Sequence, residues 1–389
     1  MNLIATRPHR AYKQPLDQQA GGPLLHPPSP MYPGRNPGAA LAEGLLMSPR
    51  HEVTPPGAEP EDAPEPGAFA HRPAMLAEVV DIFSAPSLPE GVVVDATVGA
   101  GGHARALLEA VPGRRIVGID QDPDAIVAAR EALAPFGDRA VVVKSRFDDL
   151  AAVLDELGIA SVAGALFDLG VSSPQLDRPE RGFSYRADAP LDMRMDPTQG
   201  MTAAELVNTS SADQLARLFV SHGEDRFARR IASAIVAARP MATTGALADV
   251  VSQSVPAAVR RRGHPAKRVF QALRAAVNAE LEVLPVAVDA AIDRLAPGGR
   301  IVVISYHSGE DRIVKERLAY AATGGCSCPP GLPCVCGAQP RLRLLNRGAR
   351  KPSPVEQETN RRARSARLRA AEALDPAKLL EDLKERWRW

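Results

Sequence analysis

A glycine-rich turn between two apolar segments constrains this chain most strongly. Residues 92–95 are Val-Val-Val-Asp, the turn that follows contains Gly99, Gly101 and Gly102, and a second apolar segment ends at Asp120. An acidic residue about 20 positions after the glycines is the spacing of a nucleotide-binding βαβ unit. The pattern therefore predicts that a nucleoside-containing cofactor binds at this turn.

The residues around the turn favour a methyl donor over a dinucleotide. A dinucleotide site uses G-x-G-x-x-G, whose third glycine lets a helix N-terminus lie close beneath a pyrophosphate, but Ala104 stands at that position. The carboxylate of Asp95 would repel a pyrophosphate and attract the ammonium group of a methionine tail. Glycine turns also occur for packing reasons alone, but Asp120 follows at the distance expected for a ribose diol. We therefore predict S-adenosylmethionine as the cofactor.

Apolar segments recur along the chain and predict an α/β fold. Helix-length segments separate the first of them, and this alternation is typical of a parallel, doubly wound sheet. The five strand-like segments are 92–95, 115–119, 140–144, 161–167 and 300–305.

The fourth and fifth strand-like segments are separated by a stretch too long for a single crossover connection. Helical periodicity is clearest in residues 203–219, 226–238 and 266–284. We therefore expect an inserted helical domain at 178–262, which divides the methyltransferase domain into 71–177 and 263–345.

The two ends of the chain differ from this pattern in composition. Residues 1–70 hold 14 of the 36 prolines and have no sustained hydrophobic periodicity, so we expect a disordered extension. Residues 346–389 are expected to form a basic tail that contacts nucleic acid, because ten Lys and Arg residues lie between positions 341 and 370. No apolar run is long enough to span a membrane, and the first residues lack the apolar core of a signal peptide, so we expect a cytoplasmic protein.

Acidic residues follow several of the predicted strands, where open α/β sheets bind their ligands. Asp is also a common helix N-cap residue. Capping alone would explain one or two of these acids but not the whole set. The residues just past the strands are Asp95, Asp120, Phe147 with Asp148, Asp168, and Ser305 to His307.

The segment 167–177 is the most specific of these strand ends. Asp168 stands at the tip of the fourth strand, and Ser172, Ser173 and Pro174 follow where a transferred methyl group would meet its acceptor. An amine conjugated to a base ring is a weak nucleophile, so its site needs a group that accepts hydrogen bonds from the NH2. We predict that these four residues form the catalytic site, although a solvent-facing turn capped by Asp and Ser would have a similar sequence.

The cysteines narrow the chemistry further. Methylation of C5 of a pyrimidine requires a thiolate that adds to the ring, and no cysteine follows a predicted strand. Transfer to an exocyclic nitrogen therefore fits the sequence better.

The cysteines Cys326, Cys328, Cys334 and Cys336 form a C-x-C…C-x-C pattern. A structural zinc site and a mobile loop of reduced thiols both stay open, the second being favoured because C-x-x-C is the commoner zinc spacing. We expect no metal at the catalytic site.

Two arginine-rich clusters, at 260–274 and 361–369, contain few acids. Such clusters are typical of phosphate contacts, which supply affinity without base identity. A solvated charged face is the simpler alternative. We expect nucleic-acid contact at both.

Residues 71–370 resemble the RsmH (MraW) family of bacterial small-subunit ribosomal RNA cytosine-N4 methyltransferases. Several of the shared segments are long, so the resemblance is specific. They are Asp95-Ala-Thr97 with Gly101-Gly-His103, 168–177, 181–184, 190–196, Gly223-Glu224, 264–266 with 270–272, Val277-Asn278, 305–308, 310–315 and 351–353.

The resemblance implies a class I methyltransferase domain with an inserted helical domain. It also implies methyl transfer to N4 of a decoding-centre cytidine of 16S rRNA within the small ribosomal subunit. The chain departs from the family pattern at Ala100, Tyr306 and Gly309. The donor contacts carried over from the family are Gly101, Gly102, His103, Asp120, Phe147, Asp168 and Gln175.

Alternatives remain at this stage. The donor turn alone would also suit a methyltransferase of small molecules or proteins, against which the arginine clusters argue. A regulator that binds S-adenosylmethionine and nucleic acid without catalysis would share the fold. Neither the catalytic base nor the oligomeric state, for which a homodimer is one option, follows from the sequence.

Overall fold

The computed structural model describes residues 72–223, 226–261, 263–329, 335–375 and 377. The chain divides into two units, residues 1–67 and 68–389, and every described residue belongs to the second. The extension predicted at 1–70 therefore lies outside the described residues. Among the helices that the structure describes, none is long and apolar enough to cross a membrane.

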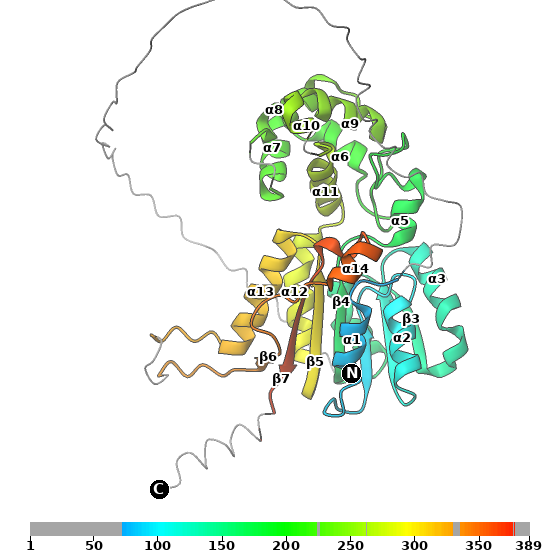
Figure 1. Cartoon of the computed structure of the whole chain (residues 1–389), viewed down its shortest axis with the longest axis vertical. Helices are drawn as coiled ribbons and strands as arrows, with labels where there is room; N and C mark the ends of the chain where they lie inside the picture. Colours follow the sequence, from blue (N-terminus) through cyan, green and yellow to red (C-terminus); the bar gives the residue numbers. More distant parts are fainter. Residues whose placement is uncertain (1–71, 224–225, 262, 330–334, 376, 378–389) are drawn as a thin grey trace, which may run out of the picture. The chain divides into compact units, whose positions relative to one another are not determined.

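A seven-stranded sheet with the order β3-β2-β1-β4-β5-β7-β6 forms the centre of the second unit (Figure 1). The five strands predicted from the sequence run parallel, while β7 is antiparallel to β5 and β6 is antiparallel to β7. The predicted α/β class I fold is confirmed. The strands are β1 (Val92–Asp95), β2 (Arg115–Asp120), β3 (Ala140–Lys144), β4 (Val162–Asp168), β5 (Leu295–Ser305), β6 (Leu342–Leu344) and β7 (Arg367–Ala373).

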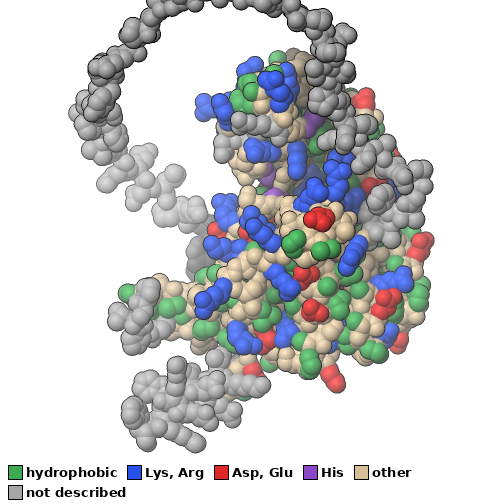
Figure 2. Space-filling view, viewed as in Figure 1, with side chains coloured by type: hydrophobic (Ala, Val, Ile, Leu, Met, Phe, Trp, Pro, Cys, Tyr) green, Lys and Arg blue, Asp and Glu red, His purple; other side chains and the backbone are tan. Residues whose placement is uncertain are grey.

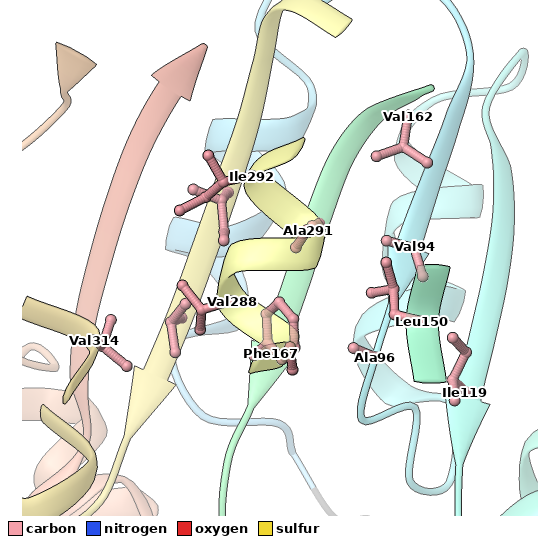
Figure 3. Packing of buried hydrophobic residues seen from close by; sticks show 14 of the residues in the cluster. Val94, Ala96, Ile119, Leu150, Val162, Phe167, Val288, Ala291, Ile292 and Val314 are labelled. Atoms are coloured by element: carbon pink, nitrogen blue, oxygen red, sulfur yellow. The ribbon is translucent and has the colours of Figure 1, made fainter. Parts of the chain in front are cut away.

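Helices cover both faces of the sheet, as a parallel sheet requires. Figure 3 shows one of the two apolar layers, in which α4 (Leu150–Glu156), α12 (Glu280–Arg294) and α13 (Ser308–Thr323) pack against the strands. The opposite layer is formed with α1 (Leu76–Phe83), α2 (Gly102–Ala110) and α3 (Pro123–Leu133). Because β1 is buried at every position, its last residue, Asp95, is held inside the fold.

The long segment between β4 and β5 is helical, as predicted. The single helix expected at 203–219 is two helices, because Ser211 caps the second of them through a capping box with Gln214. The hydrophobic cluster of this region runs from Leu191 to Leu273 and so extends past the predicted boundary at 262. The helices are α5 (Ser173–Asp177), α6 (Ala203–Thr209), α7 (Ala212–Ser221), α8 (Ala228–Ala237), α9 (Thr244–Gln253), α10 (Ala257–Arg260) and α11 (Ala266–Val277).

Part of the predicted basic tail is a strand of the sheet. Within 346–389, β7 lies between β5 and β6, so the sheet continues past the predicted domain end at 345. Two of the arginines of β7 bind the carboxylate of Asp311 on α13, Arg367 at 3.1 Å and Arg369 at 2.8 Å. These two side chains therefore contribute to the packing of the sheet edge.

Candidate active site

The turn that contains Gly99, Gly101 and Gly102 has glycines at positions that disfavour other residues. Gly99 and Gly101 adopt left-handed conformations, with φ of 52° and 83°, which favour glycine. A Cβ on Gly102, the first residue of α2, would lie 2.5 Å from Cγ of Pro73. A Cβ on Gly118 of β2 would lie 2.7 Å from the side chain of Val98. The chain therefore passes tightly from β1 over the end of β2.

Asp120 closes this turn from the end of β2. Its carboxylate accepts hydrogen bonds from the backbone N–H of Gly99 at 3.0 Å and from that of Asp122 at 2.9 Å. Burial raises the pKa of Asp120 to about 6, although these N–H groups favour the charged form. A carboxylate has about four acceptor positions, so these contacts leave Asp120 with capacity for a ligand.

Asp95 is almost completely buried, with 1% of its surface exposed. Burial, together with the smaller effect of the nearby charges of Asp168 and Asp120, raises the pKa of Asp95 to about 8. In the described part of the chain, neither Asp95 nor Asp120 forms an ion pair with a basic side chain. In the described residues, the ionised forms of these two acids therefore have no protein cation to balance them, which favours the protonated form of Asp95 until a cation binds.

Asp168 ends β4 beside these two acids. Its backbone N–H donates to Oγ1 of Thr97 at 2.6 Å, which joins β4 to the donor turn. The hydroxyl of Tyr306 donates to Oδ1 of Asp168 at 2.7 Å. Burial raises the pKa of Asp168, while His103 and the Tyr306 hydroxyl act in the opposite direction. Tyr306, which the sequence placed just past the fifth strand without assigning it a role, thus holds the predicted catalytic carboxylate.

His103 supports Asp168 from the first turn of α2. Its Nε2 lies 3.0 Å from the carbonyl oxygen of Ala74, which can only accept, so Nε2 carries the proton. Its Nδ1 then faces Oδ2 of Asp168 at 3.7 Å. The structure therefore places His103 beside Asp168. The contact of His103 with the methyl donor stays a prediction.

The turn after β4 is anchored to the end of β2. The backbone N–H of Ser172 donates to Oε1 of Gln175 at 2.9 Å, and Nε2 of Gln175 donates to Asp122 at 2.8 Å. The hydroxyl oxygen of Ser172 is buried and has no hydrogen-bond partner among the described residues. A buried polar atom without a partner is costly, so this oxygen is suited to a ligand.

For three predicted site residues the described part of the structure shows no contact that bears on their predicted role. Ser173 and Pro174 begin α5, but their side chains fall outside the description. Phe147 follows β3 and packs edge-to-face on Phe167, with ring centroids 6.1 Å apart. The predicted roles of all three remain untested.

Arg181 joins the helical region to the end of β2. Its guanidinium binds Asp122 at 3.0 Å and Asp124 at 2.9 Å, and it also donates to the carbonyl oxygens of Arg194 and Met195. No local spacing in the sequence points to this cluster, because Arg181 lies 59 residues from Asp122. The two acids are thereby neutralised within the protein.

The charges of the site fit a cationic cofactor. Asp95, Asp120 and Asp168 converge, and each has a raised pKa because its charged form is poorly solvated. A ligand with positive charge would stabilise their charged forms, whereas a pyrophosphate would be repelled. S-adenosylmethionine carries an ammonium and a sulfonium group, so these residues fit it better than they fit a dinucleotide.

Basic side chains are common on the face shown in Figure 2, over the helical region and the adjoining part of the sheet. Several arginines of the two predicted clusters have protein partners. Arg274 pairs with Glu280 at 2.8 Å, and Arg362 pairs with Asp177 at 3.2 Å. Other members, such as Arg361, are exposed. The clusters therefore combine structural arginines with exposed ones.

Known proteins resemble this chain over most of its length. The sequence pattern of the MraW methylase family matches residues 68–374. A protein of Thermobifida fusca named ribosomal RNA small subunit methyltransferase H is 56% identical over 326 residues, which are 81% of this chain and 98% of that protein. The protein of the same name from Heliobacterium modesticaldum is 49% identical over 313 residues, 79% of this chain and 99% of its own.

A solved structure, of an rRNA methylase from Streptococcus thermophilus, is a weaker match. It aligns with 79% of this chain and 100% of its own at 13% identity and a TM-score of 0.36. This similarity is too low to decide the fold, which the strand order and the family match establish.

Proposed function

The chain belongs to the MraW methylase family, and we propose that it transfers a methyl group from S-adenosylmethionine to N4 of a decoding-centre cytidine in 16S rRNA. The relatives from Thermobifida fusca and Heliobacterium modesticaldum are named as small-subunit rRNA methyltransferases. The observation that carries the proposal is the convergence of Asp95, Asp120 and Asp168 at the ends of three adjacent strands. Such a site serves both a cationic donor and an amine acceptor.

The donor side is formed by β1 and β2. When bound, S-adenosylmethionine supplies an electrophilic methyl group on a positively charged sulfur. Asp120, oriented by the N–H groups of Gly99 and Asp122, accepts hydrogen bonds from the ribose diol. Asp95 binds the ammonium of the methionine tail and is ionised by that contact. The buried packing around both acids excludes water, which strengthens these electrostatic contacts.

The acceptor side is formed by β4 and the turn that follows it. Asp168 accepts a hydrogen bond from the cytosine amine, which localises the nitrogen lone pair and directs it at the methyl group. Tyr306 holds Oδ1 of Asp168 at 2.7 Å, so the carboxylate cannot rotate freely. The partnerless hydroxyl of Ser172 is available to the base. Positioning of this kind contributes strongly to rate.

The substrate must present an unpaired or flipped cytidine, because pairing buries the amine. The exposed arginines of the helical region and of the segment 361–369 are suited to contact the phosphates around this cytidine.

The cysteines that the structure describes lie in the loop after α13. We therefore assign transfer to the exocyclic nitrogen, which needs no thiolate, in preference to C5 of the ring. An enzyme acting on small ribosomal subunits works in the cytoplasm.

The test is methylation of small subunits that lack the modification. Purified wild-type protein and Asp168→Asn are compared in single-turnover reactions, and the rRNA is digested to nucleosides for mass spectrometry. Asp168→Asn keeps the size of the side chain but replaces one acceptor oxygen with a donor. We expect N4-methylcytidine from the wild type and a rate loss of about 10²–10⁴-fold in the variant, with RNA affinity almost unchanged.

Asp138→Asn is the matched control, because Asp138 is an exposed acid after α3. Full activity of Asp168→Asn, or 5-methylcytidine as the product, would contradict the proposal. Binding of donor and RNA without any methylated product would instead support the regulator that shares this fold.

A further inference from the structure

An 18-residue connection, 324–341, joins α13 to β6 without a helix or strand among its described residues. Figure 1 shows it as an extended arm that leaves the end of α13 and returns to the sheet. Connections of this length without secondary structure are uncommon in compact domains unless they have a function. This segment plays no part in the methyl-transfer site described above.

The base of the arm is well defined. The backbone N–H of Gly325 donates to the carbonyl of Tyr320 at 3.1 Å, and that of Arg341 donates to Ala321 at 2.8 Å. A Cβ on Gly324 would lie 2.4 Å from the carbonyl carbon of Gln339, so the outgoing and returning chains are in direct contact. The arm therefore begins and ends at one place.

Three cysteine side chains meet beyond this base. The Sγ atoms of Cys326, Cys328 and Cys336 all lie within 4.8 Å of one another. Those of Cys326 and Cys336 are 3.7 Å apart, although ten residues separate them in the sequence. The backbone N–H of Val335 donates to Sγ of Cys328 at 3.4 Å.

The sulfur separation distinguishes two kinds of cysteine pair. A disulfide requires its sulfurs to be about 2.05 Å apart. Two thiolates on one tetrahedral zinc ion, each about 2.3 Å from the metal, are separated by about 3.8 Å. The observed 3.7 Å excludes a disulfide and fits the second arrangement as well as a hydrogen bond between two thiols, so the grouping of three sulfurs is what supports a metal.

We propose that Cys326, Cys328 and Cys336 bind one Zn²⁺ ion as thiolates. Thiolate ligands in tetrahedral arrangement are typical of zinc in a reducing compartment. The N–H of Val335 acts as an outer-shell donor that orients a ligand sulfur. The sequence favoured a loop of reduced thiols because of its C-x-C spacing, and the spatial grouping is what changes that interpretation. Cys334 lies outside the described residues, and the proposal rests on the other three.

The arm also has a physical need for a metal. Cys326 and Cys336 are exposed, and Val335 is 89% exposed, so the arm buries little apolar surface. Segments that lack a core of their own are commonly held by a structural metal, whose binding supplies folding free energy. The metal would fix the arm beside the sheet edge without taking part in methyl transfer.

The test is the zinc content of the full-length protein, purified under reducing conditions without chelators. We expect about one zinc per chain by elemental mass spectrometry. Cys328→Ser should reduce the zinc to background, whereas Ser327→Ala, a neighbouring substitution in the same arm, should retain it. Both variants should still bind S-adenosylmethionine, which shows that the sheet is folded.

A second measurement uses only wild-type protein, so that loss of zinc is not confused with misfolding of a variant. The arm contains no Lys or Arg before Arg341, so a protease of broad specificity, proteinase K, is used. Removal of zinc from the wild type by a chelator should make the arm cleavable by this protease, and added zinc should restore its resistance. Three results would overturn the proposal. The first is wild-type protein that holds no zinc after incubation with excess metal, the second is a full zinc content in Cys328→Ser, and the third is bound iron in place of zinc. Because donor binding is measured separately, failure of the zinc site leaves the proposed methyltransferase function unaffected.

Discussion

Two groups of acids lie at the ends of β1 and β2, and they differ in whether a basic side chain pairs with them. Asp122 and Asp124 are paired with Arg181 at 3.0 and 2.9 Å. Asp95 is as buried as Asp122, yet in the described residues Asp95 and Asp120 have only backbone N–H donors. The first group is complete within the protein and holds the helical region to the sheet. The second is incomplete, and we infer that its missing partner is the cationic donor.

The largest effect should come from breaking the complete group. Arg181→Met leaves the fully buried Asp122 without its cation and should lower the free energy of unfolding by about 3–5 kcal/mol. Arg178→Met removes a half-exposed partner of Asp124 and should cost less than about 1 kcal/mol. Urea denaturation of the two variants measures the difference. Similar losses in both would show that burial does not separate these pairs.

Substitution in the incomplete group should affect binding rather than folding. Asp120→Ala removes a charged acceptor of the ribose diol, and such hydrogen bonds contribute about 1.5–3 kcal/mol. We therefore expect affinity for S-adenosylmethionine to fall about 10- to 100-fold in calorimetry. The melting temperature should change much less than in Arg181→Met. Unchanged affinity would remove Asp120 from the donor site.

Asp168 lies between these extremes, because in the described residues its carboxylate accepts one side-chain hydrogen bond, from the hydroxyl of Tyr306. Tyr306→Phe removes that hydroxyl and little else. Loss of the 2.7 Å hydrogen bond should slow single-turnover methylation about tenfold. The hydroxyl lowers the pKa of Asp168, so the variant should need a higher pH to reach its maximal rate. Tyr320→Phe, at an exposed tyrosine of α13, is the control. An unchanged pH profile would contradict a positioning role for Tyr306.

The arginines show the same contrast on a smaller scale. Arg369 is paired with Asp311, whereas Arg361 is exposed. Arg361→Gln should flatten the salt dependence of RNA binding by roughly 0.7–0.9 log unit per log unit of salt. Arg369→Gln should leave that slope unchanged and lower thermal stability instead. Equal slopes in wild type and Arg361→Gln would place Arg361 away from the RNA.

The sequence predicted the part of the fold that depends on local pattern. The strands β1 to β5 are apolar runs, and the acids at their ends follow directly, so Asp95, Asp120 and Asp168 were recognised as site residues. Their convergence was predictable because parallel strands end at the same edge of a sheet.

The strands β6 and β7 were missed because their pattern is not strand-like when read alone. The sequence of β7, Arg-Leu-Arg-Ala-Ala-Glu-Ala, reads as basic and small residues, and its arginines are explained only by Asp311 on α13. Arg181 and Tyr306 were missed for a related reason. Their partners, Asp122 and Asp168, are 59 and 138 residues away, and no local spacing encodes such pairs.

The central claim is that Asp95 has no cationic partner among the described residues until the donor binds, and proton release on binding tests this claim most directly. In the free protein the pKa of Asp95 is raised to about 8 from 3.8. This raised value costs stability as the pH rises from about 4 through about 8, and a bound cation should reverse that loss.

Calorimetry of S-adenosylmethionine binding at about pH 7, in buffers with different ionisation enthalpies, measures the protons released. We predict a release that approaches one proton in the wild type, with affinity increasing towards pH 8, and almost none in Asp95→Asn. Equal proton release in the two proteins, or an affinity independent of pH, would contradict the account.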